Sequence, residues 1–434
     1  MTSSPATTPE TGTWCCEFEL SGTAGPTAVT PLSAQRSARV LVRLHGEPLG
    51  YLTVTVGDAG LDVPAVTRLA QAQLADRIEE HLRSEGLPVL QQPDGRPPAA
   101  THSCPNRVDT DELVTVVVCT RDRSDVLVDC LARLRRLTYP HLELLVVDNA
   151  PSDDSTRQVV EAVMADDPRF SYVCEPRPGL SCARNQGLRH ARGTYLAYTD
   201  DDVAVDPDWV QGLLRGFGHR ADVGCVTGLV CTAAISNEAE EYFDARTSSW
   251  STRCESHEFD LQGAGGTDAL FPYSPGIFGT GANFAFDRAF LQELGGFDEA
   301  LGAGTMTRGG EDLDIFVRVL RRGKAIVYEP AAIVWHHHRA DRDALLSQLY
   351  GYGTGMSAVI TKFLLQPDTR REVLSRVPLG LRRMAAIRTQ TTERLGAGAQ
   401  RPEGALLREF LGFAAGPVLY LRARRRGDRA RTVG

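Results

Sequence analysis

The densest group of acidic side chains is the run Asp200-Asp201-Asp202, which follows the apolar segment Thr194–Thr199. Carboxylate oxygens are the ligands that magnesium and manganese prefer, typically alongside substrate phosphates. Two unit charges ~4 Å apart repel by roughly 4 kcal/mol at an effective dielectric of 20, and a cation removes that repulsion. If the chain is still extended here, Asp200 and Asp202 point the same way and Asp201 the other. We therefore expect Asp200 and Asp202 to bind a metal. A solvated acidic turn that caps the next helix is the alternative.

A second acidic group, Glu311-Asp312-Leu313-Asp314, opens an amphipathic helix and follows Gly309-Gly310. Acidic residues are favoured at a helix N-terminus, so helix capping is one interpretation. A glycine pair lets the backbone approach a ligand closely, so a binding or catalytic site is the other.

Three further groups have two interpretations each. His336, His337 and His338 end a strand-like segment, and either they are structural or one of them supplies a metal ligand. Asp148 caps the next helix, or it accepts an N–H group of a nucleoside base. Arg184 is a surface residue, or it faces phosphate or holds the acidic loop.

These residues are positioned by alternating strand and helix patterns that begin near Leu113. The apolar strands are Val114–Cys119, Leu142–Val147, Ser171–Cys174 and Thr194–Thr199, and the intervening helices are Val126–Leu137, Ser155–Ala165 and Leu180–Ala191. This alternation predicts an α/β fold with a doubly wound, mostly parallel sheet. Ligands bind beyond the carboxyl ends of such strands, where Thr120, Asp122, Asp148 and the acidic run all lie. No G-x-G-x-x-G or Walker A motif follows the first strand, so a dinucleotide site and a P-loop are unsupported.

Composition divides the 434 residues into five regions. We expect a flexible lead-in, a small αβ appendage, a linker, a catalytic α/β domain and a helical, basic C-terminal region, spanning 1–35, 36–90, 91–112, 113–340 and 341–434 respectively. In the appendage, Arg39–Val56 predicts a hairpin and Val63–Leu82 a helix.

Charge is distributed unevenly along the chain. Arg370–Gly434 contains 15 arginines and 5 acidic residues, which gives this segment a net charge of +10. Because the whole chain has a net charge of −8, residues 1–369 carry about −18. Within this tail, Leu406–Leu421 is apolar but interrupted by Gly416-Pro417, and clustered arginines follow. Either this segment is a helix packed on the body with a disordered basic end, or it docks on an anionic membrane.

Cysteine usage and hydropathy bear on the compartment. The ten cysteines include no CxxC pair, which argues against a cysteine zinc site and favours a reducing, cytoplasmic compartment. Neither a secretory signal nor a stretch of roughly 18 apolar residues is present, so we expect no spanning helix. We expect no nucleic-acid partner, and at most peripheral association with the inner membrane face.

The order of the motifs resembles glycosyltransferase family 2. The matching pieces are VTVVVCTRDR, LLVVDNAPSDDST, GLSCARNQGL, GTYLAYTDDDV, GTGANFAFDR, LGGFDE, GGEDLDIFVR and VWHHH, between Val114 and about His338. The resemblance implies a Rossmann-like GT-A fold, a divalent cation (Mn²⁺ or Mg²⁺), and inverting transfer of a sugar from a nucleoside diphosphate donor, UDP- or dTDP-linked.

The resemblance also implies roles for residues. Asp148 would face the base, Asp200, Asp202 and His336 would bind the metal, and Asp312 would be the general base. The remaining expected donor contacts are Thr120, Asp122, Arg184, Asp201 and Glu311. The acceptor is not indicated, and lipid-linked and natural-product acceptors are both compatible.

The Q-x-x-R-W motif of processive members is absent, because the chain reads Ser347-Gln348-Leu349-Tyr350 at that place. This departure favours addition of one or few sugars. Two other functions are compatible with the layout: a sugar-phosphate nucleotidyltransferase, and an inactive domain that binds sugar or nucleotide. A nucleotidyltransferase would need a glycine-rich, basic phosphate loop early in the domain, and none is seen. An inactive binding domain would not need Asp200, Asp202 and Asp312 together, so their joint presence argues against it.

Overall fold

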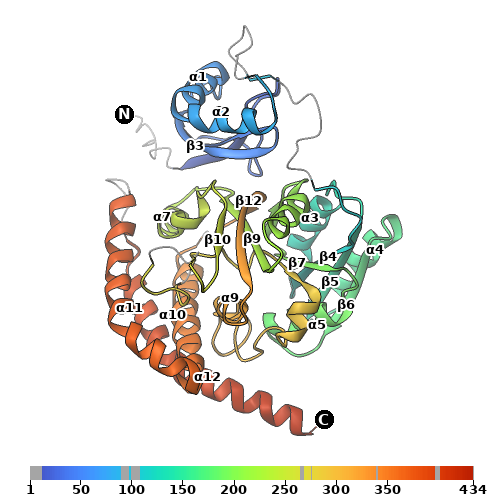
Figure 1. The fold of residues 1–434 in the computed structure, drawn as a ribbon, viewed down its shortest axis with the longest axis vertical. Helices are drawn as coiled ribbons and strands as arrows, with labels where there is room; N and C mark the ends of the chain where they lie inside the picture. Colours follow the sequence, from blue (N-terminus) through green and yellow to red (C-terminus); the bar gives the residue numbers. More distant parts are fainter. Residues whose placement is uncertain are drawn as a thin grey trace, which may run out of the picture.

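The structure is a computed structural model that describes residues 12–88, 97–98, 108–263, 268–274, 276–338, 341–395 and 401–433. Its centre is a nine-stranded sheet with helices on both faces (Figure 1). The strands are β4 Val114–Thr120, β5 Leu142–Asn149, β6 Phe170–Glu175, β7 Tyr195–Asp200, β8 Val203–Val205, β9 Val223–Thr232, β10 His257–Phe259, β11 Asn283–Asp287 and β12 Ala325–His336.

The sheet is mixed but mostly parallel. Its order is β10-β12-β9-β11-β7-β4-β5-β6, and β8 pairs with β12 outside this path. Strands β4, β5, β6, β7, β9 and β12 run in one direction, whereas β8, β10 and β11 run against them. The predicted α/β class is thereby confirmed.

Helices cover both faces because the central strands are apolar on both sides. Val116 and Val118 of β4 pack in one core with helices α3 (Ser124–Leu134), α4 (Ser155–Asp166) and α6 (Trp209–Gly218). Val117 faces the other core, which contains helices α5 (Leu180–His190), α8 (Arg288–Glu293) and α9 (Glu311–Arg321). Alternate residues of a strand point to opposite faces, so a run of buried β-branched residues requires two covering layers.

Strand register gathers the polar strand ends at one edge. Thr120 at the end of β4 is level with Asp148 in β5, and Cys119 is level with Asp200 at the end of β7. At the same edge, His336 ends β12 beside Thr232 of β9. Residues from distant parts of the chain therefore meet where the parallel strands end.

The N-terminal unit is larger than predicted. The segment Thr13–Glu19, expected within a flexible lead-in, is strand β1 and pairs parallel with β2 (Ser37–Leu44). Trp14, Cys16 and Phe18 pack in the core of the unit. Parallel pairing joins segments that are not adjacent in the sequence, so local patterning does not reveal this strand.

The rest of the unit contains the expected hairpin, in which β2 pairs antiparallel with β3 (Glu47–Thr55). The predicted single helix over Val63–Leu82 is instead two helices, α1 (Val63–Gln73) and α2 (Ala75–Ser84), which are separated at Leu74. Most of the predicted linker lies outside the described residues.

Apolar contacts and ion pairs hold the N-terminal unit on the catalytic domain. Cys15 and Leu41 share a small core with residues of β9 and β12, including Trp335. Arg43 Nη1 lies 2.6 Å from Asp206 of the catalytic domain and 2.8 Å from Glu17 of β1. Both Arg43 and Asp206 side chains are at least 89% buried, with exposed fractions of 11% and 5%.

Three helices form the C-terminal region: α10 Arg342–Leu365, α11 Pro367–Arg394 and α12 Ala405–Val433. They run down one side of the molecule to its lower end (Figure 1). The expected interruption at Gly416-Pro417 is not observed, because α12 continues through Pro417. A Cβ at Gly416 would lie 2.0 Å from Ser357 Oγ of α10, so the absence of a side chain allows the two helices to pack closely. No helix in these described ranges combines the length and apolar character needed to cross a bilayer.

We predict that Arg43→Met lowers the free energy of unfolding by about 3–5 kcal/mol, because removing one partner of a buried pair leaves Asp206 uncompensated. The matched control is Arg36→Met, whose pair with Asp58 has exposed fractions of 53% and 94%. We expect the control to cost no more than about 1 kcal/mol. Denaturant-induced unfolding measures both, and equal losses would show that the Arg43 pair does not hold the units together.

Candidate active site

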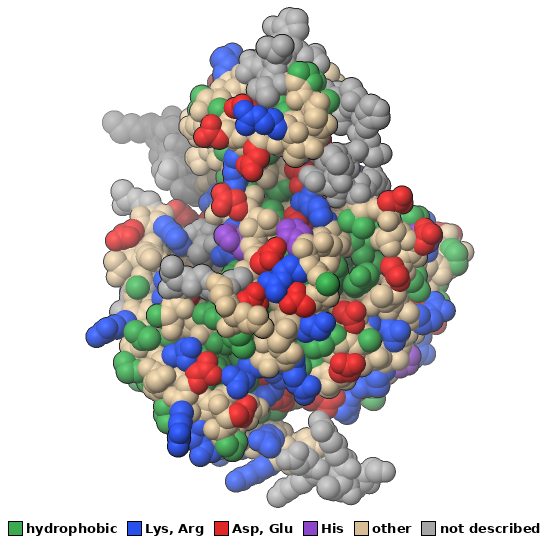
Figure 2. All heavy atoms as spheres, in the orientation of Figure 1, with side chains coloured by type: hydrophobic (Ala, Val, Ile, Leu, Met, Phe, Trp, Pro, Cys, Tyr) green, Lys and Arg blue, Asp and Glu red, His purple; other side chains and the backbone are tan. Residues whose placement is uncertain are grey.

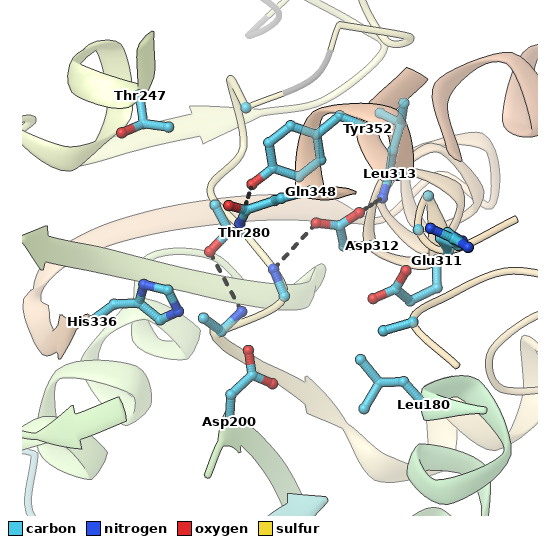
Figure 3. A pocket seen from close by; sticks show the side chains of 18 of the residues that line it. Leu180, Asp200, Thr247, Thr280, Glu311, Asp312, Leu313, His336, Gln348 and Tyr352 are labelled. Atoms are coloured by element: carbon cyan, nitrogen blue, oxygen red, sulfur yellow. Dashed lines mark hydrogen bonds between the residues drawn. The ribbon is translucent and has the colours of Figure 1, made fainter. Parts of the chain in front are cut away.

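A cavity of about 1070 Å³ opens where the strands end. Eight of the ten predicted site residues line it: Thr120, Arg184, Asp200, Asp201, Asp202, Glu311, Asp312 and His336. Figure 3 shows Asp200, His336 and Asp312 around one space, with the Thr280 loop between them. The structure therefore brings together carboxylates from β7 and α9 and an imidazole from β12.

The acidic run does not have the predicted extended conformation. Strand β7 ends at Asp200, and Asp201 and Asp202 lie in a turn before β8. Neighbouring side chains hold Asp201 in place: its carboxylate accepts hydrogen bonds from Thr120 Oγ1 at 2.7 Å and from Arg123 Nη1 at 2.6 Å. Arg123 Nη2 also donates to Asp202 at 3.0 Å. Arg123 thus neutralises part of the charge and fixes the shape of the turn.

The three histidines have different environments. His336 lines the cavity, and its Nε2 lies 3.6 Å from Asp202 Oδ1. The side chain of His337 is exposed, and that of His338 is buried with Nε2 3.1 Å from Thr232 Oγ1. Burial lowers the pKa of His338 to about 3, so it stays neutral. Of the three, His336 alone lines the cavity.

The electrostatics of Asp200 fit a cation site. The pKa of Asp200 is raised to about 7, mainly by burial in the cavity wall; Arg184 lowers it, and Asp202 and Asp201 contribute smaller increases. A raised carboxyl pKa means that the negative charge here is incompletely compensated by the protein. Asp200, Asp202 and His336 together offer oxygen and nitrogen donors that suit a divalent cation.

Arg184 is buried and contacts acidic residues, so the interpretation of it as a surface residue is wrong. Its fully buried guanidinium donates to Glu311 Oε1 at 3.1 Å and to the carbonyl of Gly281 at 2.9 Å. A longer contact of 3.5 Å joins it to Asp200 Oδ1. Its guanidinium carbon also lies 4.9 Å from the centre of the Phe284 ring. Arg184 therefore links α5, β7, the loop before β11, and α9.

Glu311 and Asp312 are adjacent in α9 but differ in environment. Glu311 is buried against Arg184, and burial together with Asp312 raises the pKa of Glu311. Asp312 is half-buried in the cavity wall, where Oδ2 accepts from the Gly281 amide at 3.3 Å and Oδ1 accepts from its neighbour Leu313 at 2.8 Å (Figure 3). The preceding residue, Gly310, has a φ of +90°, a conformation that glycine adopts without strain.

The two remaining predicted residues do not line the cavity. Asp122 has a φ of +51° and its Oδ1 accepts from the amide and hydroxyl of Ser152 at 2.8 and 2.9 Å, so it braces two loops. Asp148 is fully buried behind the cavity, and its neighbour Asn149 lines the wall instead. Tyr172 donates to Asp148 Oδ2 at 2.8 Å, whereas Oδ1 is buried without a hydrogen-bond partner among the described residues.

The sequence analysis missed part of the cavity wall. Arginines from several segments line it: Arg121, Arg123, Arg246, Arg308, Arg383 and Arg394. Helix α10 contributes Gln348 and Tyr352, whose side chains are 3.3 Å apart (Figure 3). The only signal for α10 was the departure from the Q-x-x-R-W pattern beside Gln348. The arginines carry no local signature, because they converge from distant segments.

The part of the chain that precedes α9 is similar to a known protein family. Residues 115–295 match the family described as Glycosyl transferase family 2. The match ends before Asp312 and His336, so the structure is what places these two residues in the same cavity as the acidic turn.

Individual similarities are distant. A putative glycosyltransferase of Bacillus subtilis, EpsH, is 29% identical over 29% of this chain, and the match spans only 35% of that protein. The glucosyl-dolichyl phosphate glucuronosyltransferase of Haloferax volcanii is 25% identical over 55% of this chain and 75% of that protein. A solved mannosyltransferase from Pyrobaculum calidifontis, in complex with GDP-Man and Mn²⁺, is 19% identical over 73% of this chain and 86% of that one, with a TM-score of 0.45.

We predict that His336→Ala weakens Mn²⁺ binding, because it removes a donor beside Asp202, whereas His337→Ala leaves it unchanged. His337 is the matched control because it is the next residue and its side chain is exposed. Calorimetric titration with Mn²⁺ measures both variants, and Asp202→Asn serves as the variant expected to abolish binding. Equal affinities for the two histidine variants would return His336 to a structural role.

Proposed function

We propose that the chain transfers a sugar from a nucleoside diphosphate donor to an acceptor hydroxyl, and the match of residues 115–295 to glycosyltransferase family 2 supports this proposal. The observation that carries the proposal is the convergence of Asp200, Asp202, His336 and Asp312 on one cavity. The reaction is a single displacement that inverts the configuration at the anomeric carbon, and it adds one or few sugars.

Asp200, Asp202 and His336 would hold the divalent cation, Mn²⁺ or Mg²⁺. A cation bound there supplies charge stabilisation for the diphosphate leaving group. Arg123 keeps the acidic turn in place, and the arginines of the cavity wall provide further positive charge for phosphate oxygens.

The base of the donor would lie against the ends of β4 and β5. Asp148 supports this placement, because its buried Oδ1 lacks a partner and burial raises its pKa. Such an oxygen can accept the ring N–H of uracil or thymine once a loop movement or side-chain rotation exposes it. UDP- and dTDP-sugars are therefore the proposed donors, and Thr120 and Asn149 line the adjacent wall.

Asp312 is the proposed general base, which takes the proton of the acceptor hydroxyl as that oxygen attacks. Its neighbours are poorly suited to the role. Glu311 is paired with Arg184, and Asp314 is fully buried with Oδ1 2.6 Å from Lys362 Nζ and Oδ2 2.9 Å from Arg318 Nε. Asp312 combines cavity exposure with backbone hydrogen bonds that keep its carboxylate oriented.

The two rival functions make different predictions. A nucleotidyltransferase would form a nucleotide sugar from a nucleoside triphosphate and release pyrophosphate, and an inactive binding domain would bind donor without consuming it. A panel of nucleotide sugars, screened by thermal shift with Mn²⁺ present, identifies the donor because binding raises the melting temperature. Release of nucleoside diphosphate from that donor then separates the transferase from both rivals.

We predict that Asp312→Asn lowers turnover by about 10²–10⁴-fold, because general-base catalysis contributes a factor of that size. Donor binding by thermal shift should stay at the wild-type level. Asp343→Asn is the matched control, since Asp343 is an exposed acidic residue on α10 outside the cavity wall. Turnover of Asp312→Asn within a few-fold of wild type would exclude Asp312 as the base.

The acceptor side of the proposal concerns α12. This helix packs against α10, which agrees with the interpretation of the tail as a helix packed on the body. Its outer face is nevertheless apolar. The exposed residues recur at helical spacing and are Leu407, Phe410, Leu411, Val418 and Leu421, with exposed fractions of 38–61%. Exposed Arg422, Arg424, Arg425 and Arg426 follow directly. Basic side chains gather with apolar ones over the lower helices in Figure 2.

An apolar helix face beside clustered arginines suits the surface of an anionic membrane, where each basic residue adds about 1 kcal/mol of binding. The chain is therefore proposed to associate peripherally with the inner membrane face, near a lipid-linked acceptor. One relative, from Haloferax volcanii, is named for a lipid-linked substrate, glucosyl-dolichyl phosphate. A natural-product acceptor is the alternative, and it would not require α12 to bind lipid.

We predict that the chain co-sediments with vesicles containing anionic lipid, that binding falls with salt, and that Leu407→Glu with Phe410→Glu abolishes it. These substitutions are preferable to removing α12, because both side chains are exposed while the opposite face of the helix packs on α10. Val128→Glu is the matched control, since Val128 is 48% exposed on α3. Equal sedimentation of all three proteins, or no sedimentation of the wild type, would contradict the membrane proposal.

A further inference from the structure

Two histidines and a glutamate meet inside the N-terminal unit, away from the cavity. His45 lies at the turn between β2 and β3, and His81 and Glu85 lie one turn apart at the end of α2. Their side chains have exposed fractions of 2%, 8% and 4%. One ligand atom from each lies within 4.8 Å of the other two. None of the three belongs to the glycosyltransferase region or to a motif of the sequence analysis.

Two of the three separations given for these atoms are close to those of a tetrahedral metal site. Zinc binds histidine nitrogen and carboxylate oxygen at about 2.0–2.2 Å, so tetrahedral ligand atoms stand about 3.3–3.5 Å apart. His81 Nε2 lies 3.3 Å from His45 Nδ1 and 3.2 Å from Glu85 Oε1. His45 Nδ1 is 2.5 Å from Glu85 Oε2, a contact that a proton fills in the absence of a cation. Glu85 Oε1 is buried and has no hydrogen-bond partner in the described part of the chain, so this acceptor is available to a ligand.

Surrounding groups hold His45 in the orientation that a metal requires. Its other ring nitrogen, Nε2, lies 2.9 Å from the carbonyl of Pro98 and donates to it. This donation leaves Nδ1 as the nitrogen that faces the site, which is the usual arrangement around a metal-bound histidine. The backbone of His45 has a φ of +53°, and Glu19 fixes this turn by accepting from the amides of His45 and Gly46 at 3.0 Å each.

We propose that His45, His81 and Glu85 form a binding site for Zn²⁺ or a chemically similar divalent cation, with water as the fourth ligand. Two histidines and one glutamate are an established ligand set for zinc. A cation bound at this site would link the β2–β3 hairpin to α2, two segments that are separated along the chain. The residues flanking His45 contact the catalytic domain: Arg43 pairs with Asp206, and Glu47 pairs with Arg215 at 2.5 Å. The cation therefore stabilises the part of the N-terminal unit that docks on the catalytic domain.

The test is zinc binding by the full-length chain, purified through a tag without histidine and freed of metal by chelator dialysis. Zinc is titrated against a chromophoric chelator, and the melting temperature is recorded with and without zinc. We expect the wild type to bind one equivalent of zinc that survives in Asp202→Asn, and zinc to raise the melting temperature of both proteins. Glu85→Gln and His81→Gln should lose this equivalent and the thermal response, with affinity reduced by more than the roughly 10–100-fold typical of a lost outer-shell partner.

His141→Gln is the matched control, because its side chain is 43% exposed and it should retain wild-type binding. Asp202→Asn separates this site from the catalytic cation, so failure of one assignment leaves the other testable. The titration of the wild type does not depend on the folding of any variant. If the wild type and Asp202→Asn bind no zinc and show no thermal response, or if Glu85→Gln and His81→Gln bind as the wild type does, the cluster is a proton-linked hydrogen-bond network and the proposal is wrong.

Discussion

The buried guanidinium of Arg184 is the contact on which the candidate active site depends. It lies between Glu311 and Asp200, whose carboxylates would otherwise repel across a poorly solvated space, and it also binds the carbonyl of Gly281. An unpaired buried charge is costly, so the guanidinium of Arg184 and the carboxylates beside it stabilise one another. This one side chain therefore fixes α9, and with it Asp312, relative to the end of β7. A different residue, Arg123, holds the acidic turn by donating hydrogen bonds to Asp201 and Asp202.

The cavity connects the chemistry of the sheet edge to the C-terminal helices. Helix α10 lines the cavity through Gln348 and Tyr352 on one side and packs against α12 elsewhere. Glycines allow this close packing: a Cβ at Gly412 would lie 2.2 Å from the carbonyl oxygen of Tyr350. Helix α12 is thus packed directly on the helix that lines the cavity. A membrane-held acceptor would be presented to the cavity without a flexible linker.

The β2–β3 hairpin is one of the segments that hold the N-terminal unit on the catalytic domain, beside β1 and α2. The β2–β3 hairpin carries Arg43 and Glu47, which pair with Asp206 and with Arg215 of the catalytic domain. His45, between them, faces the interior of the unit instead. A cation at that point and the ion pairs on either side would act on the same short segment, so the stability of the unit and of its docking are coupled.

Local sequence determined the first four strands of the catalytic domain and the helices between them, because runs such as Val114–Thr120 encode a buried strand through residue type and periodicity alone. It also determined that carboxylates lie at the carboxyl ends of strands, since position within an element is a local property. The tertiary structure alone decided which of these side chains face the cavity. Asp200, Asp201 and Asp202 line the cavity, whereas Asp148 is fully buried and does not line it, although it also stands at a predicted ligand position. It also decided that Thr13–Glu19 is a strand and that His45 meets Glu85. These contacts join residues far apart in the chain. A long-range contact produces no periodic pattern in the sequence near either residue, so local sequence does not reveal it.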